Sequence, residues 1–132
     1  MQIQMQAIGY FYTRAKEIPR HWSLSEEKGS IVVQKEFEQG LRDIQVGEDI
    51  VVIFYFHRSP QFSSSQLIQT PPHKDRSFGV FSVCSPKRPN PIGLSVLEVL
   101  AVKDNVVYVN RVDMLDQTPV LDIKPHIELE GK

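Results

Sequence analysis

The chain has 132 residues, of which 41% are apolar and 23% are charged, and its formal net charge is −1. These values fit one domain with a buried core and exclude a disordered or collagen-like chain. One cysteine, Cys84, leaves no partner for an intrachain disulfide or a multi-cysteine zinc site. The longest apolar run is too short for a membrane helix, and the opening MQIQMQ lacks the pattern of a secretion signal. We therefore expect a cytoplasmic protein that binds neither a membrane nor a metal.

Strand-like runs dominate the first half of the chain. Aromatic and β-branched residues predict strands over residues 7–13 and 30–33. Apolar residues at helical spacing predict one short helix over residues 35–44. The continuous apolar run 49–57 is typical of a strand that is buried on both faces.

The second half adds three predicted strands. Both faces of residues 77–83 are mostly apolar, which favours a buried strand. Residues 94–102 and 106–112 predict a hairpin that turns at residues 103–105. Many short strands, one short helix and nine prolines predict an all-β or β-rich barrel that forms a single domain over residues 1–132. No two glycines are spaced as G-x-G, which excludes a Rossmann dinucleotide fingerprint and a P-loop.

The segment 85–93, SPKRPNPIG, is rich in proline and lies in a basic region. Its prolines fix their own φ angles and push the preceding residues toward extended conformations. The result is a stiff loop that presents Arg88 and Asn90 with little further loss of entropy on binding. This pattern predicts a recognition loop, and a rigid corner between strands is the alternative interpretation.

The segment 113–125, DMLDQTPVLDIKP, combines three carboxylates with a predicted turn at residues 116–119. One interpretation is a polar pocket edge whose backbone groups bind a ligand. The other is purely structural: Asp116 caps the turn, and Asp122 pairs with Lys124.

Together these two segments resemble the TsaA-like (TrmO-like) family of tRNA methyltransferases. The resemblance rests on G-V-F-x-x-x-S-P-x-R-P-N-P-I-G-L-S at 79–95 and on D-x-L-D-x-T-P-V-L-D-I-K-P at 113–125. The pairs Ile8-Gly9, Pro19-Arg20 and Phe56-His57 also fit, so the resemblance extends over about residues 7–127.

The resemblance implies a small β-barrel, S-adenosyl-L-methionine as cofactor and a homodimer. It implies methylation at N6 of N6-threonylcarbamoyladenosine, next to the anticodon of tRNA. The cofactor-binding residues that it implies are Pro19, Arg20, His21, His57, Arg58, Asp116, Gln117, Thr118 and Pro119, with a contribution from around Leu97.

Two further sets of residues complete the expected site. A weak base must accept the proton that the acceptor nitrogen loses, and the candidates are Asp116, His57 and His126. We expect the substrate to contact Lys87, Arg88, Asn90 and Lys124.

The chain departs from the family pattern at five positions: His21, Arg58, Cys84, Gln117 and His126. The family commonly has an arginine in the place of Cys84, and this change removes several hydrogen-bond donors. Two alternatives therefore stay open. One is a non-catalytic barrel that binds S-adenosylmethionine or a nucleotide as a sensor or partner subunit. The other is a barrel that only binds RNA.

Overall fold

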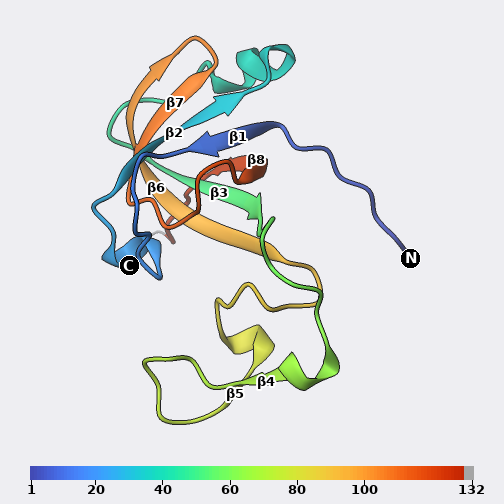
Figure 1. Ribbon diagram of the computed structural model, residues 1–132. Helices are drawn as coiled ribbons and strands as arrows, with labels where there is room; N and C mark the ends of the chain where they lie inside the picture. The colour runs from blue at the N-terminus through green and yellow to red at the C-terminus, as the bar shows by residue number, and fades with distance from the viewer. Residues whose placement is uncertain (130–132) are drawn as a thin grey trace.

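A computed structural model, which describes residues 1–129, shows a closed antiparallel barrel with an irregular excursion at one end (Figure 1). The barrel order is β1-β2-β7-β6-β3-β8, with β8 returning to pair with β1. The strands are β1 (Gly9–Tyr12), β2 (Lys28–Val33), β3 (Asp49–Tyr55), β6 (Ile92–Lys103), β7 (Val106–Asn110) and β8 (Pro119–Pro125). The β-rich barrel predicted from the sequence is confirmed, and it is not a Rossmann fold.

Alternation along the strands fills the barrel with apolar side chains. Phe11, Val52, Leu97 and Val107 are fully buried there, each on a different strand. Burying one such side chain stabilises the fold by about 2 kcal/mol. The predicted strand over 49–57 is present as β3, whose buried and half-buried residues alternate.

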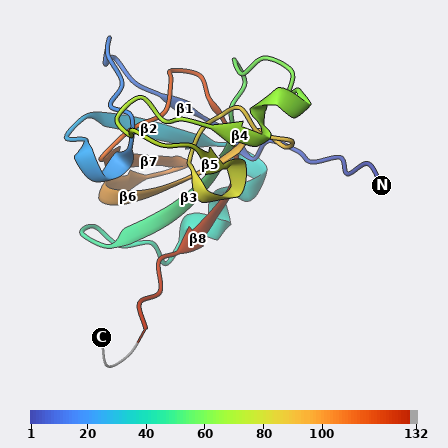
Figure 2. The ribbon, with the colours of Figure 1, turned by 90° about the horizontal axis from the view of Figure 1, so that it is seen from below.

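Residues 56–91 leave the barrel between β3 and β6 and form the excursion. It contains η3 (Ser64–Leu67), β4 (Ile68–Gln69), β5 (Phe78–Gly79) and η4 (Val80–Ser82), with β4 and β5 paired as a two-stranded sheet. Seen from below, β4 and β5 lie in front of the barrel (Figure 2). The excursion therefore covers part of one end of the barrel.

The prediction of a buried strand over residues 77–83 is wrong. Only Phe78 and Gly79 pair with a neighbouring strand, and the chain then turns into η4. Val80 is buried, whereas the side chain of Phe81 is 79% exposed. The segment has only the two residues of β4 as a partner, and a strand cannot extend beyond its hydrogen-bonded neighbour.

The remaining predicted elements are present with shifted ends. The helix expected over 35–44 is the 3-10 helix η2 (Lys35–Leu41), and a shorter 3-10 segment of one turn, η1 (Trp22–Leu24), lies between β1 and β2. The predicted hairpin is β6–β7, and its tip residue Asp104 has a φ of 54°. Within the described residues, no helix combines the length and apolar character needed to cross a membrane.

Candidate ligand-binding site at one end of the barrel

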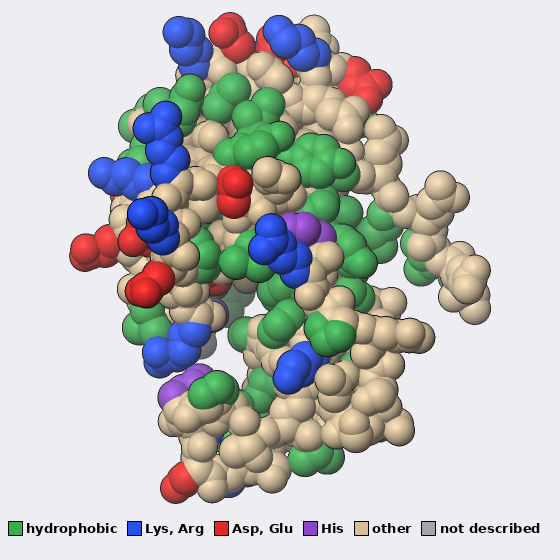
Figure 3. All heavy atoms as spheres, viewed as in Figure 1, with side chains coloured by type: hydrophobic (Ala, Val, Ile, Leu, Met, Phe, Trp, Pro, Cys, Tyr) green, Lys and Arg blue, Asp and Glu red, His purple; other side chains and the backbone are tan. Residues whose placement is uncertain are grey.

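A cavity of about 670 Å³ lies between the end of the barrel and the excursion. Figure 3 shows a hollow there, with basic and histidine side chains around it. Five chain segments supply its lining: 18–22 after β1, 54–60 at the end of β3, 83–88 in the excursion, 92–94 at the start of β6, and 113–118 before β8. This volume lies in the range of sites that bind cofactors and other small ligands.

Positive charge dominates the walls of this cavity. The cationic side chains are Arg20, Arg58, Lys87 and Arg88, and the histidines are His21 and His57. They come from three separate segments, so no local stretch of sequence reveals the cluster. Walls of this kind attract anionic groups such as phosphates and carboxylates.

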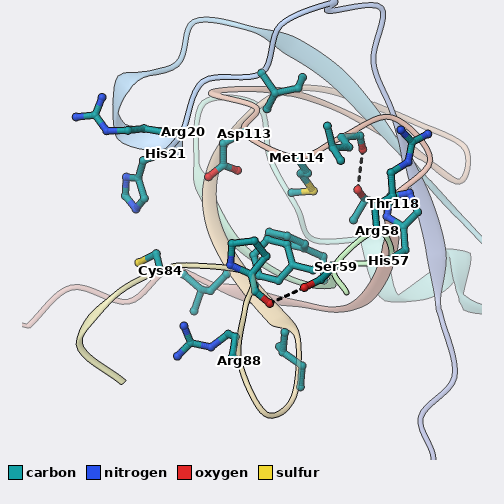
Figure 4. A pocket seen from close by; sticks show the side chains of 18 of the residues that line it. Arg20, His21, His57, Arg58, Ser59, Cys84, Arg88, Asp113, Met114 and Thr118 are labelled. Atoms are coloured by element: carbon teal, nitrogen blue, oxygen red, sulfur yellow. Dashed lines mark hydrogen bonds between the residues drawn. The ribbon is translucent and has the colours of Figure 1, made fainter. Parts of the chain in front are cut away.

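Asp113 is the one carboxylate among the described residues that line the cavity (Figure 4). The hydroxyl of the fully buried Ser95 donates a hydrogen bond of 2.5 Å to its Oδ1. The backbone N–H of Trp22 also donates to this carboxylate. Burial raises the pKa of Asp113 above its ordinary value, and the hydrogen bonds from Ser95 and Trp22, together with the nearby charge of His21, oppose this shift only in part.

Aromatic and apolar side chains form the part of the cavity nearest the barrel interior. The rings of Phe54 and Phe56 meet edge to face, with their centroids 5.1 Å apart. Gly93 allows this packing, because a Cβ at that position would lie 2.3 Å from Phe54 and 2.8 Å from Phe56. Trp22 and Met114 also line the cavity.

The proline-rich loop forms the wall opposite Asp113 and is held by its own hydrogen bonds. Nη1 of Arg88 donates to the carbonyl oxygens of Val83, at 2.8 Å, and Ser85, at 3.1 Å. Ser59 Oγ donates to the carbonyl of Pro86 at 3.0 Å, which ties the loop to the end of β3. Within the described residues the hydrogen bonds of Arg88 therefore go to the loop backbone, and it forms no ion pair with Asp113 or Asp122.

His57 lies at the opposite side of the cavity from the loop residue Cys84 (Figure 4). Burial, and the positive charge of Arg58 beside it, lower the pKa of His57 below its ordinary value of 6.5. The imidazole is therefore neutral at neutral pH and can accept a proton.

The structure brings about half of the predicted site residues to this cavity. Those that line it are Pro19, Arg20, His21, His57, Arg58, Lys87, Arg88 and Thr118. Those that do not are Asn90, Leu97, Asp116, Gln117, Pro119, Lys124 and His126.

Two residues of the 116–119 turn have structural roles beside the cavity. Asp116 Oδ1 accepts a hydrogen bond of 2.9 Å from the backbone N–H of Thr13, which ties the turn to the end of β1. Gln117 has a φ of 67°, a conformation that favours glycine. This turn also positions Thr118, whose buried hydroxyl donates a hydrogen bond of 2.7 Å to the carbonyl of Leu115.

Leu97 and Lys124 lie away from the cavity for different reasons. Leu97 belongs to the hydrophobic core with no exposed surface, whereas Leu94, nearer the start of β6, lines the cavity. Lys124 pairs with Asp122 at 2.8 Å and lines a second cavity, of about 450 Å³. That cavity is at the other end of the barrel, because Lys124 lies opposite Val51 in the β8–β3 strand register, near the start of β3.

His126 follows β8 at that same far end, beyond the pairing of Pro125 with Ile50.

Sequence reasoning gave no role to Asp113, Ser95, Trp22 or Met114. Asp113 did carry a signal, since it opens the segment 113–125, but the bond from Ser95 joins residues 18 positions apart. Among the described residues, no group of His, Cys, Asp or Glu has an arrangement that could hold a metal ion.

These features define a small barrel with a candidate ligand-binding cavity at one end, which has cationic walls and an aromatic interior. Residues 7–130 match the family described as tRNA-methyltransferase O N-terminal domain, and the chain belongs to this family.

Relatives and solved structures agree with this assignment. The chain is 37% identical over 129 residues to a "Probable S-adenosyl-L-methionine-binding protein" of Archaeoglobus fulgidus, a match that covers 96% of this chain and 34% of the relative. It is 35% identical over 114 residues to a "tRNA (adenine(37)-N6)-methyltransferase" of Mus musculus, covering 83% of this chain and 26% of that protein. The solved structure of TrmO from Pseudomonas aeruginosa superposes with a TM-score of 0.76 at 28% identity, covering 96% of this chain and 57% of the other. The chain thus spans only part of the length of these proteins.

Proposed function

We propose that this protein is an S-adenosyl-L-methionine-dependent tRNA methyltransferase that methylates N6 of N6-threonylcarbamoyladenosine next to the anticodon. The observation that carries the proposal is the composition of one cavity, which combines cationic side chains, one carboxylate and aromatic rings. Membership in the family and the name of the mouse relative support the same reaction. We further propose that the protein acts in the cytoplasm.

The residues of the cavity fit this cofactor. Arg20 offers a guanidinium to its carboxylate, and the apolar surfaces of Trp22 and Phe56 suit its adenine ring. Pro19, His21, Arg58 and Thr118 complete the part of the lining that was expected from the sequence. When bound, the cofactor supplies a methyl group on a positively charged sulfur.

His57 is the proposed general base. Of the three candidates it is the one that lines the cavity, and its lowered pKa keeps the imidazole neutral. Asp116 already accepts a hydrogen bond from Thr13, and His126 is at the far end of the barrel. His57 therefore takes the proton that N6 of the substrate loses, as a neutral imidazole within hydrogen-bond reach of the acceptor can do.

The rim of the cavity is the proposed contact with tRNA. Lys87 is exposed, and Arg88 uses only Nη1 in its bonds to the loop within the described residues. Asn90 is exposed in the same loop. These side chains suit phosphate oxygens, whose binding weakens as salt is raised.

The test is transfer of a labelled methyl group from S-adenosylmethionine to two preparations of the same tRNA, with and without the threonylcarbamoyl group on the adenosine next to the anticodon. We expect label only in the modified tRNA, and mass spectrometry of its nucleosides should show one added methyl group on that nucleoside. Equal labelling of both preparations would contradict the proposed substrate.

We also propose a homodimer, the commonest symmetric assembly. Light scattering at micromolar concentration measures the mass directly. A monomer with full activity would contradict this proposal.

A second candidate function is a non-catalytic binder of S-adenosylmethionine or a nucleotide. The observation that favours it is Cys84, which lines the cavity in the place where the family commonly has an arginine. The archaeal relative also bears a name that describes binding alone. Cofactor binding without methyl transfer to any tRNA would favour this function.

A further inference from the structure

Asp113 has no ion-pair partner within the described residues, although four cationic side chains line the same cavity. Over residues 1–129 the ion pairs are Arg42–Asp43, Arg111–Asp49 and Lys124–Asp122. The hydroxyl of Ser95 and the backbone N–H of Trp22, both uncharged, donate hydrogen bonds to Asp113, and His21 is near enough to act on it by its charge without forming an ion pair. A half-buried carboxylate that is oriented by neutral donors remains able to pair with a cation from a ligand.

The charged and titratable groups that line the cavity with Asp113 come from three of its five segments. His21 and Arg20 come from the segment after β1, and His57 and Arg58 from the end of β3. The excursion contributes Cys84, Lys87 and Arg88. Asp113 is therefore the one acidic side chain of the described lining that can offset the charge of a cationic ligand group.

Aromatic side chains line the same cavity as this carboxylate. The rings of Phe54 and Phe56 approach β6 at Gly93, in the space that a side chain at this position would fill. Ser95, which holds Asp113, is two residues further on and faces the same side, a step of about 7 Å. Trp22, whose N–H also holds Asp113, lines the same region.

A carboxylate beside aromatic rings is the arrangement that recognises onium ions. Ring faces attract weakly hydrated cations, and a nearby carboxylate adds direct charge pairing. A sulfonium is such a cation, whereas the thioether that remains after methyl transfer is neutral. The same contacts therefore distinguish the two forms of the cofactor.

We propose that Asp113, held by Ser95, is the counter-ion of the cofactor's sulfonium and makes the cavity select the methylated cofactor over S-adenosylhomocysteine. This inference rests on the proposed function, because it requires S-adenosylmethionine to occupy this cavity. It assigns Asp113 to recognition of charge, a role separate from that of the base His57.

Calorimetric titration of wild-type protein and Asp113→Asn with both ligands tests the proposal without any measurement of activity. Asparagine keeps the shape of the side chain and removes its charge. We expect Asp113→Asn to bind S-adenosylmethionine about ten-fold or more weakly, and S-adenosylhomocysteine within about two-fold of wild type. Asp43→Asn is the matched control, because Asp43 is exposed and lines the cavity at the far end, and it should change neither affinity.

The outcomes separate the two levels of the proposal. Equal losses for both ligands, or no loss for either, would overturn the role of Asp113 while leaving the cofactor site in place. If wild-type protein binds neither ligand, the proposed function itself fails, and this inference fails with it.

A comparison within the wild-type protein decides the matter if Asp113→Asn does not fold. Sinefungin carries an amine, which is cationic when protonated, where the cofactor carries its sulfonium. We expect wild-type protein to bind sinefungin and S-adenosylmethionine more tightly than S-adenosylhomocysteine. Tighter binding of the neutral S-adenosylhomocysteine than of both cationic ligands would overturn the proposal.

Discussion

The hydroxyl of Ser95 donates a hydrogen bond of 2.5 Å to Asp113, and so a fully buried residue of β6 orients a carboxylate that lines the cavity. The two residues are 18 positions apart in the sequence. The bond fixes the segment before β8 against the barrel, at the point where Thr118 and Met114 also reach the cavity.

Asp113 should make the stability of the protein depend on pH. Burial raises its pKa above the ordinary 3.8, so the folded state holds the proton more tightly than the unfolded state. The stability that this provides is fully present below the ordinary pKa and is lost as pH rises through the raised value. Each unit of the shift corresponds to about 1.4 kcal/mol.

Asp113→Asn removes this dependence. As pH rises from the ordinary pKa of an aspartate through the raised pKa of Asp113, the free energy of unfolding of the variant should increase relative to that of wild type. Urea denaturation at a series of pH values measures the difference. A difference that stays constant with pH would contradict the prediction.

Arg88→Ala should both loosen the proline-rich loop and weaken the tRNA contact. The variant leaves the carbonyls of Val83 and Ser85 without their donor, and we expect a loss of about 1–2 kcal/mol of stability. Thermal melting measures that loss, and single-turnover methyl transfer measures the contact. Lys87→Ala is the comparison, because Lys87 is exposed and its side chain makes no hydrogen bond within the described residues. A variant of Arg88 that melts like wild type would contradict the structural role.

Gln117→Gly should stabilise the protein. The φ of 67° at Gln117 costs an L-residue about 1 kcal/mol, whereas glycine adopts it freely. Glycine also gains entropy in the unfolded state, so we expect a net gain of about 0.5 kcal/mol. Gln117→Ala is the control, since alanine keeps the strained φ. If alanine gave the same gain in chemical denaturation, the backbone would not be its cause.

Asp116→Ala should destabilise the turn and displace Thr118. The change leaves the N–H of Thr13 without its acceptor, at a cost of about 1 kcal/mol. Cofactor affinity should fall with it, because the turn positions Thr118 in the cavity. Asp116→Asn retains an oxygen for Thr13 and should restore both properties. If it restores stability but not affinity, the carboxylate itself contacts the ligand.

The fold could be predicted from the sequence where local pattern decides it. Alternation and β-branching predicted β1, β2, β3 and the β6–β7 hairpin, because each of these strands buries one face or more against the barrel. The same pattern failed at residues 77–83. Both faces of that segment are mostly apolar, but a strand also needs a hydrogen-bonded partner, and β4 offers only two residues for pairing.

The candidate site could be predicted only in part. The sequence determined a stiff proline-rich loop, a turn at 116–119 and motifs that place the chain in its family. It also supplied most of the cavity's cationic side chains, because those residues lie within the motifs.

Only the tertiary structure decided which of these residues share a cavity. β8 runs from the cavity to the opposite end of the barrel, so Thr118 at its start lines the site while Lys124 and His126 do not. Asp113 gains its orientation from Ser95 on another strand, and its raised pKa comes from burial. Motif and periodicity are properties of neighbouring residues, whereas the convergence of five segments around one carboxylate depends on how the barrel closes.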